Sequence, residues 1–566
     1  MKKIISIMSS AAFACASVFI WGCQGKSNFT RTENADIVVY GGTSAGVVSA
    51  VRAAKTGKSV ILVAPEKHLG AMSSSGLTYT DSGKTYSIGG LSREFYHRIW
   101  REYQKPEAWN IQPRSQFQNK GQGTKAIDDE HQVMWIFESK VAERVYENWL
   151  KEFGNIKVYK QERLDRSGAG VSKNGAKIVS IRTESGRVFG GKMFIDATFE
   201  GDLMAASGCS YMTGRESNSE YGENFNGYRR TMKHNLHFFK SKVSPYKIAG
   251  DKSSGLLNFA NVQPRLENGA ADKKIQSYCF RMCLSSSPDA ANWKKIEKPE
   301  NYNPENYELL LRSLKANPEF YPILIGKLPN LKFDCNNRGA VSFDFIGGNY
   351  DYPEASYAER EKIVKAHLDY QLGLIYFMQT DARVPQNIQN AVKKLGYASD
   401  EFADNGHIPY NLYIREARRM KGEYVMTQAD CQNTRKTPDS IGMGSYWLDS
   451  HNTSRFIDED GFIQNEGDVE VPLYEPYKIA YGAIIPQKSE CENLFAPVAC
   501  SSTHLAYGSI RMEPVFMILG HSAALAASMA IDANCAVQDI DRAKYNGLLL
   551  KDGQILENPR KKSVKK

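Results

Sequence analysis

The sequence lacks the cysteine spacing that metal and cluster proteins use. It has 10 cysteines, and no two of them form a Cys-X-X-Cys pair. Structural zinc sites and iron–sulfur clusters are built on such closely spaced cysteines, so we expect neither and predict no metal site. A His-Glu-X-X-His motif is also missing, which argues against a zinc hydrolase. Cys279 and Cys283 could meet on one helix face, but burial as small apolar side chains is the favoured interpretation.

Charge of one sign is also scarce in the body of the chain. The formal net charge is +9 over 566 residues, but Lys2, Lys3 and five basic residues after Pro559 carry most of that excess. A nucleic-acid-binding protein would concentrate basic residues on a folded face, so no nucleic-acid partner is expected. We predict a solvated basic tail over residues 546–566. With 42% hydrophobic and 24% charged residues, the composition excludes a disordered, fibrous or multi-span membrane protein.

The first residues have the composition of an export signal. Two lysines precede the mostly apolar run Ile4–Trp21, and a glycine then precedes Cys23. This arrangement resembles a bacterial lipoprotein signal peptide, residues 1–22, after which Cys23 would be lipidated. We therefore expect an exported lipoprotein, anchored to a membrane through Cys23 in the periplasm or at the outer membrane, with residues 23–34 as a polar tether. An uncleaved membrane anchor and a cytosolic helix are the alternatives.

The next segment has the pattern of a nucleotide-binding strand–turn–helix–strand unit. Residues 35–40 predict a buried strand, residues 47–55 a helix and residues 59–63 a second strand. Small residues in the turn let backbone N–H groups and the helix N-terminus approach a pyrophosphate. The candidate cofactor-binding residues of this turn are Gly41, Gly42, Thr43, Ser44, Ala45 and Gly46.

Two positions depart from the usual Gly-X-Gly-X-X-Gly pattern. Thr43 stands where the second glycine is expected, which requires a negative φ there and makes its hydroxyl a candidate phosphate contact. The acidic residue that binds a ribose hydroxyl normally ends the second strand, but here Ala64 stands near that position. Glu66 follows two residues later, and it would either reach the ribose or face solvent.

Longer motifs resemble one known family over nearly the whole chain. The sequences VVYGGTSAG, HLGAMSSSGLTYTD, FIDATFEGDLMAASG, DSIGMGSYWLDSHN and HLAYGSIRMEPVFMILG resemble a bacterial family of FAD-dependent oxidoreductases. Its exported members often carry the label xanthan lyase, and it is distantly related to the flavin-binding part of heterodisulfide reductase. The resemblance implies FAD as the cofactor. It also implies an α/β fold, in which a Rossmann-like FAD domain of the two-dinucleotide-binding type carries a large inserted α+β substrate region.

The resemblance also divides the chain into regions. It implies a discontinuous FAD-binding domain, residues 35–215 and 470–545, around a substrate domain formed by residues 216–469. Within the second part, residues 493–499 predict a returning strand. Pro514 then lies in the first turn of a predicted apolar helix.

Several residues are implied to surround the flavin. Ala71, Met72 and Ser73 resemble the small-residue stretch that lies under the flavin in relatives. Arg511, together with the N-terminus of the apolar helix, would stabilise the negative charge of the reduced flavin. A weaker hypothesis makes His68 a covalent attachment point for FAD, and the favoured alternative is a loop histidine with local hydrogen bonds.

Oxidation of an alcohol at a flavin also needs a base, and histidine suits that role near neutral pH. We rank His504 first, on the predicted loop before the apolar helix, and His451 second, in the inserted region; either could instead be a structural histidine. Arg511 completes the catalytic candidates. The sequence YIREARRM predicts a helix, on which Arg415 would either join an ion-paired face or hold a substrate.

We therefore predict an FAD-dependent oxidoreductase that transfers a hydride between the flavin and a small polar substrate. The expected substrate is a sugar or sugar derivative, and the expected reaction is oxidation of an alcohol to a ketone. The electron acceptor is unknown. One alternative is a flavin-dependent reductase fed by a redox partner. Another is an inactive flavoprotein-like binding lipoprotein, for which the departures at Thr43, Ala64 and Ala71 are the motivation.

Overall fold

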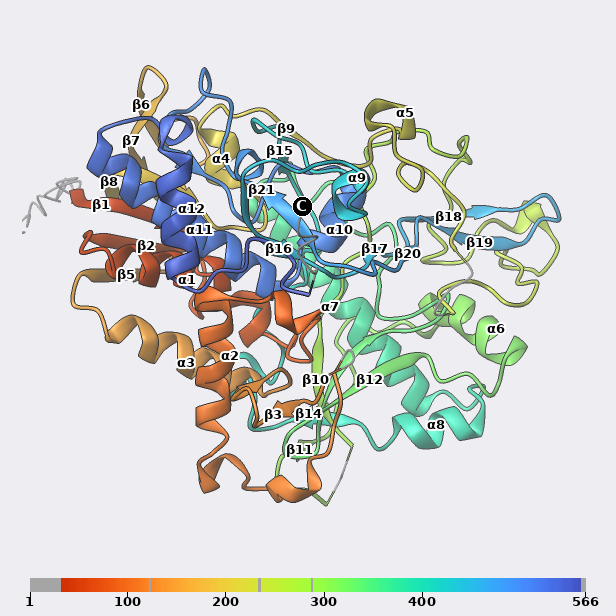
Figure 1. Cartoon of the computed structure of the whole chain (residues 1–566). Helices are drawn as coiled ribbons and strands as arrows, with labels where there is room; N and C mark the ends of the chain where they lie inside the picture. Colours follow the sequence, from red (N-terminus) through yellow and green to blue (C-terminus); the bar gives the residue numbers. More distant parts are fainter. Residues whose placement is uncertain (1–31, 122–123, 233–235, 287–288, 561–566) are drawn as a thin grey trace, which may run out of the picture.

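The computed structural model of the chain describes residues 32–560 except 122–123, 233–235 and 287–288 (Figure 1). The predicted signal peptide, Cys23 and residues 24–31 of the predicted tether lie outside the described residues, as do residues 561–566. Helix α12 (Arg542–Lys551) occupies the beginning of the region predicted as a basic tail. Tyr545 and Leu549 of this helix are fully buried, so they attach it to the core and the tail is shorter than predicted.

A seven-stranded sheet forms the centre of one half of the molecule, in the order β5-β2-β1-β8-β7-β6, with β22 also paired to β8 (Figure 1). Its strands are β1 (Thr32–Tyr40), β2 (Val60–Ala64), β5 (Ile156–Lys160), β6 (Val171–Asn174), β7 (Lys177–Arg182), β8 (Val188–Asp196) and β22 (Leu494–Phe495). The strands β5, β2, β1, β8 and β22 are parallel, whereas β7 pairs antiparallel with β8 and β6 with β7. This parallel core with its strand–helix–strand beginning is a Rossmann-like α/β fold.

The ends of two strands differ from their predicted positions. Strand β1 ends at Tyr40 as predicted but begins at Thr32, so residues 32–34 belong to the sheet and not to a tether. Strand β22 keeps only two of the seven residues predicted for it. The chain leaves the sheet after Phe495 because the next amide, Ala496 N, donates a hydrogen bond to Ile484 O at 2.9 Å.

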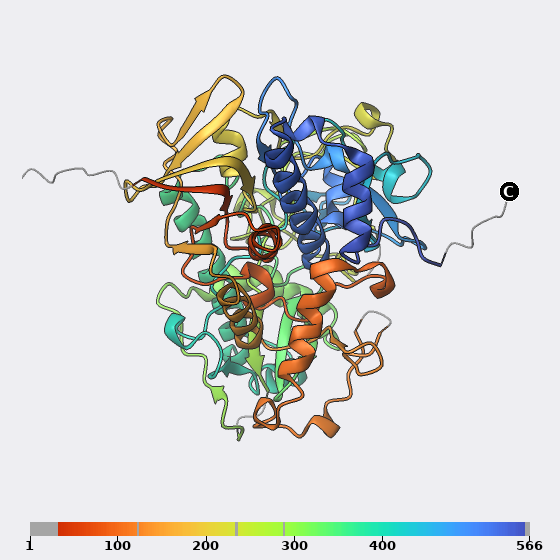
Figure 2. The same ribbon diagram turned by 60° about the vertical axis from the view of Figure 1, so that its left-hand side comes forward.

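Two apolar helices pack against each other on one face of this sheet (Figure 2). They are α1 (Ser44–Ala54) and α11 (Glu513–Ala533). A Cβ at Gly520 would lie 2.5 Å from Ala45 O, so only glycine allows this close contact. Within the described part of the chain, α11 is the one helix long and apolar enough to cross a membrane, but 89% of its most apolar window is buried inside the protein. An all-round apolar helix of this kind is a core helix.

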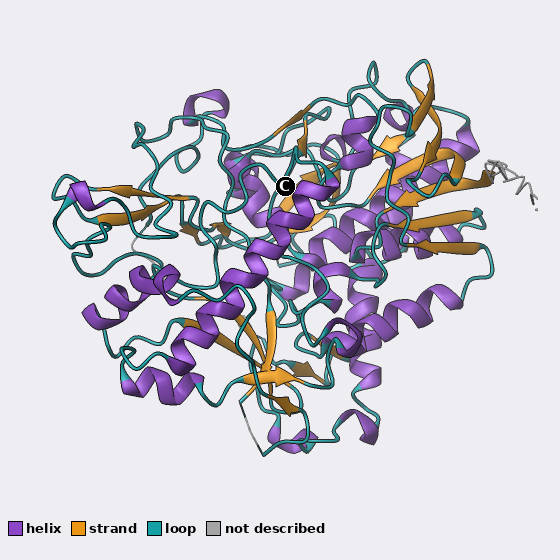
Figure 3. Cartoon of the chain, turned by 180° about the vertical axis from the view of Figure 1, so that it is seen from behind, coloured by secondary structure: helices purple, strands orange, loops and turns teal. Residues whose placement is uncertain are grey.

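A five-stranded antiparallel sheet lies in the inserted region (Figure 3). In spatial order its strands are β11 (Trp293–Lys294), β14 (Gly396–Ala398), β10 (Met282–Ser285), β13 (Lys332–Asn337) and β12 (Ile323–Leu328). The longer helices of this region are α6 (Glu308–Ala316), α7 (Tyr357–Thr380) and α8 (Gln386–Val392). Antiparallel strands with separate helices make the insert α+β, as predicted. Cys283 lies in β10 and Cys279 just before it, so the two buried thiols do not share a helix face.

Short helices and two-stranded pairs complete the described chain. The helices are α2 (Gly90–Glu102), α3 (Ser139–Lys151), α4 (Asp202–Ala206), α5 (Asn218–Tyr221), α9 (Gln428–Cys431) and α10 (His504–Ile510). The paired strands are β3 (Ile127–Asp128) with β4 (Val133–Met134), β9 (Tyr211–Met212) with β15 (Arg419–Met420), β16 (Ser440–Gly444) with β21 (Tyr477–Ala480), β17 (Leu448–Ser450) with β20 (Val469–Val471), and β18 (Ser454–Ile457) with β19 (Ile463–Glu466).

The segment YIREARRM, predicted as a helix, is not helical: only its last two residues, in β15, form a strand, and residues 414–418 are irregular. All three of its arginines are buried, and each needs a carboxylate partner because an unpaired buried charge is strongly destabilising. The ion pairs are Arg415–Asp344 (2.9 Å), Arg418–Asp202 (2.8 Å) and Arg419–Glu216 (2.8 Å). The three carboxylates come from different segments of the chain.

Candidate functional site

The glycine-rich turn follows β1 at the carboxyl edge of the parallel strands. Gly41 has a φ of 114°, and a Cβ there would lie 2.7 Å from the carbonyl carbon of Ala197. A Cβ at Gly46 would lie 1.9 Å from Gly41 O. Glycine is therefore required at both positions. The turn places the N-terminus of α1 at the edge where parallel sheets bind their ligands.

Thr43 makes the departure from the glycine pattern compatible with this turn. Its φ is −69°, the negative value that the sequence required. Its Oγ1 accepts a hydrogen bond from Gly46 N at 3.2 Å and donates one to Ala197 O at 2.7 Å. Because the hydroxyl hydrogen is donated to the protein, Thr43 caps α1 and does not offer that hydrogen to a phosphate.

Glu66 lies beside the turn, where an acceptor for a ribose hydroxyl would be needed. A Cβ added at Gly42 would lie 3.8 Å from Glu66 Oε2. Burial, together with the nearby charge of Glu200, raises the pKa of Glu66 to about 7. The Glu66 side chain is partly buried at this position, and its contact with a ribose stays a prediction.

The N-termini of α1 and α11 meet at a hydrogen bond. Ser44 Oγ, at the start of α1, donates to Glu513 Oε2, at the start of α11, at 2.5 Å. Burial raises the pKa of Glu513 to about 7, although the bond from Ser44 partly opposes this. The end of α11 that was expected to face the flavin therefore begins with a buried carboxyl group.

The short 3₁₀ helix η1 (Ala71–Ser74) brings the other predicted flavin-side residues to the same place. Ala71 begins it with a φ of 45°, a left-handed conformation that is uncommon for alanine. Ser73 lines one small cavity together with Met512 and Glu513. The structure thus joins the segment after β2 to the segment before α11.

His68 lies apart from these residues. Its Nδ1 is 2.7 Å from a Glu143 carboxylate oxygen and its Nε2 is 3.1 Å from an Asp404 carboxylate oxygen. Its ring stacks on Tyr410 with a centroid distance of 3.5 Å. Both ring nitrogens are engaged by carboxylates, so the geometry agrees with the favoured loop-histidine interpretation and does not support a covalent flavin link.

His504 is the first residue of α10, not part of a loop as predicted. Its Nδ1 is 2.7 Å from Glu416 Oε2, and its Nε2 is 3.1 Å from Ser450 Oγ. Burial alone would raise the pKa of Glu416, but the charges of His504 and Arg419 lower it to about 2. An ionised carboxylate therefore holds one ring nitrogen of His504, and a serine contacts the other.

His451 follows β17 and has a different arrangement. Its Nδ1 is 2.7 Å from Asp344 Oδ2, and its Nε2 is 3.8 Å from Asp449 Oδ2, beyond hydrogen-bond distance. Burial and the charge of Arg415 lower the pKa of His451 to about 4. Burial acts to raise the pKa of Asp344, but Arg415 and His451 hold it well below its usual range. Neutral His451 thus donates from Nδ1 to Asp344 and keeps the lone pair of Nε2.

Arg511 connects the pair His451–Asp344 to an open pocket through Asp449. Its Nη1 donates to Tyr413 Oη at 2.6 Å and its Nη2 to Asp449 Oδ2 at 2.6 Å. Asp449 lines a pocket of about 460 Å³. The other lining residues are Gly83, Lys84, Ser445, Tyr446, Trp447 and Glu470.

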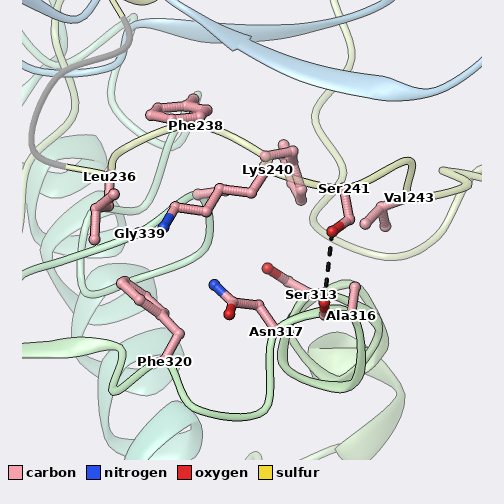
Figure 4. Close-up of a pocket in the computed structure, with 12 residues that line it drawn as sticks. Leu236, Phe238, Lys240, Ser241, Val243, Ser313, Ala316, Asn317, Phe320 and Gly339 are labelled. Atoms are coloured by element: carbon pink, nitrogen blue, oxygen red, sulfur yellow. Dashed lines mark hydrogen bonds between the residues drawn. The ribbon is translucent and has the colours of Figure 1, made fainter.

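The sequence did not single out Asp449, Ser450 or Tyr413, although the first two stand in the same Asp-Ser-His-Asn motif as His451. A different cavity, of about 20 Å³, lies between residues 236–243 and the end of α6 (Figure 4). None of the predicted site residues lines it, and its volume holds little more than a water molecule.

The comparisons with known proteins identify the family. A family model described as FAD dependent oxidoreductase matches residues 36–549. No curated protein matches the chain. A solved geranylgeranyl bacteriochlorophyll reductase-like protein from Thermoplasma acidophilum is 11% identical with a TM-score of 0.33, over 92% of this chain and 85% of that one.

Two further solved structures are similarly distant. The FrdA chain of E. coli quinol fumarate reductase is 12% identical with a TM-score of 0.31, over 92% of this chain and 74% of that one. PqsL from P. aeruginosa is 11% identical with a TM-score of 0.18, over 29% of this chain and 42% of that one. The chain therefore spans less than half of PqsL. The cradle formed at Gly41 and Gly46 suits a dinucleotide, and the family model covers most of the sequence. The chain belongs to the FAD-dependent oxidoreductase family, and it is an FAD-dependent oxidoreductase.

Proposed function

We propose that the enzyme oxidises an alcohol group of a small polar substrate, a sugar or sugar derivative, to a ketone. The observation that carries this proposal is the pair His451–Asp344 lying directly behind Asp449 at the pocket wall. A pocket of about 460 Å³ is within the range of small-molecule sites. Trp447, which is 39% exposed, supplies a flat apolar surface for the C–H face of a sugar ring.

His451 is the better candidate for the base, ahead of His504. Nε2 of His451 is 3.8 Å from Asp449 Oδ2, which is too far for a hydrogen bond. Nε2 of His504, in contrast, is already 3.1 Å from Ser450 Oγ. The His451 side chain is also more exposed than that of His504, 10% against 3%. A base must have a nitrogen lone pair that the substrate proton can reach.

The roles of the surrounding residues follow from their contacts. Asp449 is the carboxylate at the pocket wall, where it accepts a hydrogen bond from the substrate hydroxyl. The hydroxyl proton passes to Nε2 of His451, and the ionised Asp344 stabilises the resulting imidazolium. Arg511 holds Asp449 in place and keeps a fixed positive charge beside the reaction. FAD, when bound, supplies the two-electron acceptor.

The nucleotide end of the site is proposed to hold the other part of FAD. The N-terminus of α1 faces the pyrophosphate, and Glu66 accepts a hydrogen bond from the ribose. The position of Glu66 beside Gly42 supports this assignment.

We further propose that the enzyme is an exported lipoprotein held at a membrane through Cys23. The lysines, apolar run and cysteine of residues 2–23 support this location. Labelling of growing cells with a tagged fatty acid tests it. The wild-type protein is expected to carry the label and Cys23→Ser to lack it, and an unlabelled wild type would contradict the lipid anchor.

An anaerobic screen of sugars and uronic acids tests the reaction. The purified holoenzyme is mixed with each compound, and loss of the oxidised-flavin band at about 450 nm is followed. One compound is expected to bleach the band, and His451→Gln is expected to slow the bleaching while the band itself remains. Bleaching by none of the sugars or uronic acids, in an enzyme that binds FAD, would refute the substrate class.

A further inference from the structure

Two cysteines from distant parts of the sequence meet on the face of the parallel sheet opposite α1 and α11. Cys209 follows α4, and Cys491 precedes β22. Their side chains are buried in one apolar cluster with Tyr40 and Met204. The two thiols are close enough to shift each other's pKa, which is lowered for Cys491 and raised for Cys209.

The backbone on either side of each cysteine is held independently of the thiols. Ser210 N donates to the Glu490 carboxylate at 3.1 Å. Lys173 Nζ donates to Ser207 O and to Glu490 O, each at 2.7 Å. These three contacts fasten the segment that contains Cys209 to the segment that contains Cys491, and they fix the separation of the two residues.

We propose that Cys209 and Cys491 form a disulfide bond in the mature enzyme. It would join the end of the first FAD-binding segment, after α4, to the segment that returns to the parallel sheet. The proposal does not depend on the substrate of the enzyme. It does agree with export, because disulfides form and persist in oxidising compartments.

No equivalent bond is expected for Cys283 and Cys335, which lie in the neighbouring strands β10 and β13. Cys283 stands opposite Asp334, and Cys335 stands opposite Met282. Successive residues of a strand point to opposite faces, so these two thiols are on different sides of the sheet. Cys283 therefore serves as a buried control that lacks a partner in bonding geometry.

The chemistry starts at Cys491. Both thiols are buried in the folded chain, so the exchange takes place during folding, before this region closes. The Cys491 thiolate attacks the disulfide of a thiol–disulfide oxidoreductase, which forms a mixed disulfide and releases one carrier thiolate. Cys209 then attacks the sulfur of Cys491 and passes its proton to the departing second carrier thiolate. Two electrons leave the protein, and the carrier disulfide becomes a dithiol.

The bond can be detected by thiol titration and peptide mapping. Holoenzyme that has been exported to the oxidising compartment is purified without reductant, denatured, and alkylated with and without prior reduction. Reduction is expected to expose two further thiols. The unreduced digest should contain one linked pair of peptides, around residues 209 and 491, two hydrogens lighter than the separate peptides. An equal number of thiols with and without reduction, or a link at other cysteines, would overturn the proposal.

Thermal unfolding gives a second readout. A disulfide that closes a loop of this length stabilises the folded chain, so reductant is expected to lower the Tm of the wild type by several degrees. Cys209→Ser should already have the lower Tm and should not respond to reductant. Cys283→Ala should keep the reductant-dependent shift. A shift that persists in Cys209→Ser would also refute the bond, and FAD absorbance confirms that each variant is folded.

Discussion

The nucleotide turn and the substrate wall of this enzyme are built in opposite ways. The turn uses residues close in sequence, and its geometry follows from side chains that are missing at Gly41 and Gly46. The wall uses charged side chains from separate segments. His451 and Asp344 are 107 residues apart, and Arg511 and Asp449 are 62 residues apart. The difference teaches that the shape of the turn depends mainly on local backbone conformation, although Ala197 packs against it, whereas the proposed proton acceptor depends on contacts between remote segments.

The largest effect is expected at the wall. His451→Gln should lower kcat by about 100- to 10,000-fold, the usual contribution of a general base, while FAD remains bound. Stopped-flow measurement of anaerobic flavin reduction checks the rate, and the absorption spectrum checks the cofactor. His504→Gln is the matched comparison, and it should reduce the rate less. A greater loss in His504→Gln would reverse the assignment of the base.

A smaller effect is expected at the turn. Gly41→Ala forces a side chain into a left-handed conformation beside Ala197, a strain of about 1–3 kcal/mol. FAD affinity should fall about 10- to 100-fold, measured by fluorescence titration of the apoprotein. Gly154→Ala is the control, because a Cβ at Gly154 meets nothing within 4 Å. Equal FAD affinity in both variants would show that the turn does not hold the cofactor.

The pH dependence of kcat/KM tests the base at the substrate wall. With the pKa of His451 lowered to about 4 from the usual 6.5, the base stays neutral well below pH 6. The value of kcat/KM should therefore stay flat from pH 7 to about pH 5 and decline only near pH 4. A decline centred near pH 6.5 would mean that a histidine with an ordinary pKa is the base.

At Glu513, at the start of α11, a change in stability is expected and not a change in activity. Its folded pKa, raised from 4.5 to about 7, makes the protein lose stability as the pH rises from about 4.5 to about 7, and the loss is complete above 7. This shift corresponds to about 3 kcal/mol when the carboxyl must ionise. Glu513→Gln should therefore raise the Tm by a few degrees at pH 8 and leave it nearly unchanged at pH 5. Glu94→Gln, on the half-buried outer side of α2, is the control, and a gain of equal size at both pH values would contradict the titration of Glu513.

Local patterns predicted the elements that depend on nearby residues. The strand ending at Tyr40, the glycine turn and the apolar helix around Pro514 all occur in the structure. The YIREARRM segment was mispredicted, because its arginines are stabilised by carboxylates that the local sequence does not contain. The partners of His451 and His504 were missed for the same reason, since hydrogen-bond partners depend on which segments meet.

The sequence by itself determined the Rossmann-like beginning, the need for a small-residue turn and the choice of FAD. These three features follow from the alternation of apolar residues, from the conformations that glycine allows and from long motifs, and each of these can be read from the sequence alone. Only the tertiary structure decided which histidine keeps an available nitrogen, that Asp449 and Arg511 connect it to the pocket, and that Cys209 meets Cys491. Those properties depend on burial and on distances between remote segments, which no linear pattern specifies.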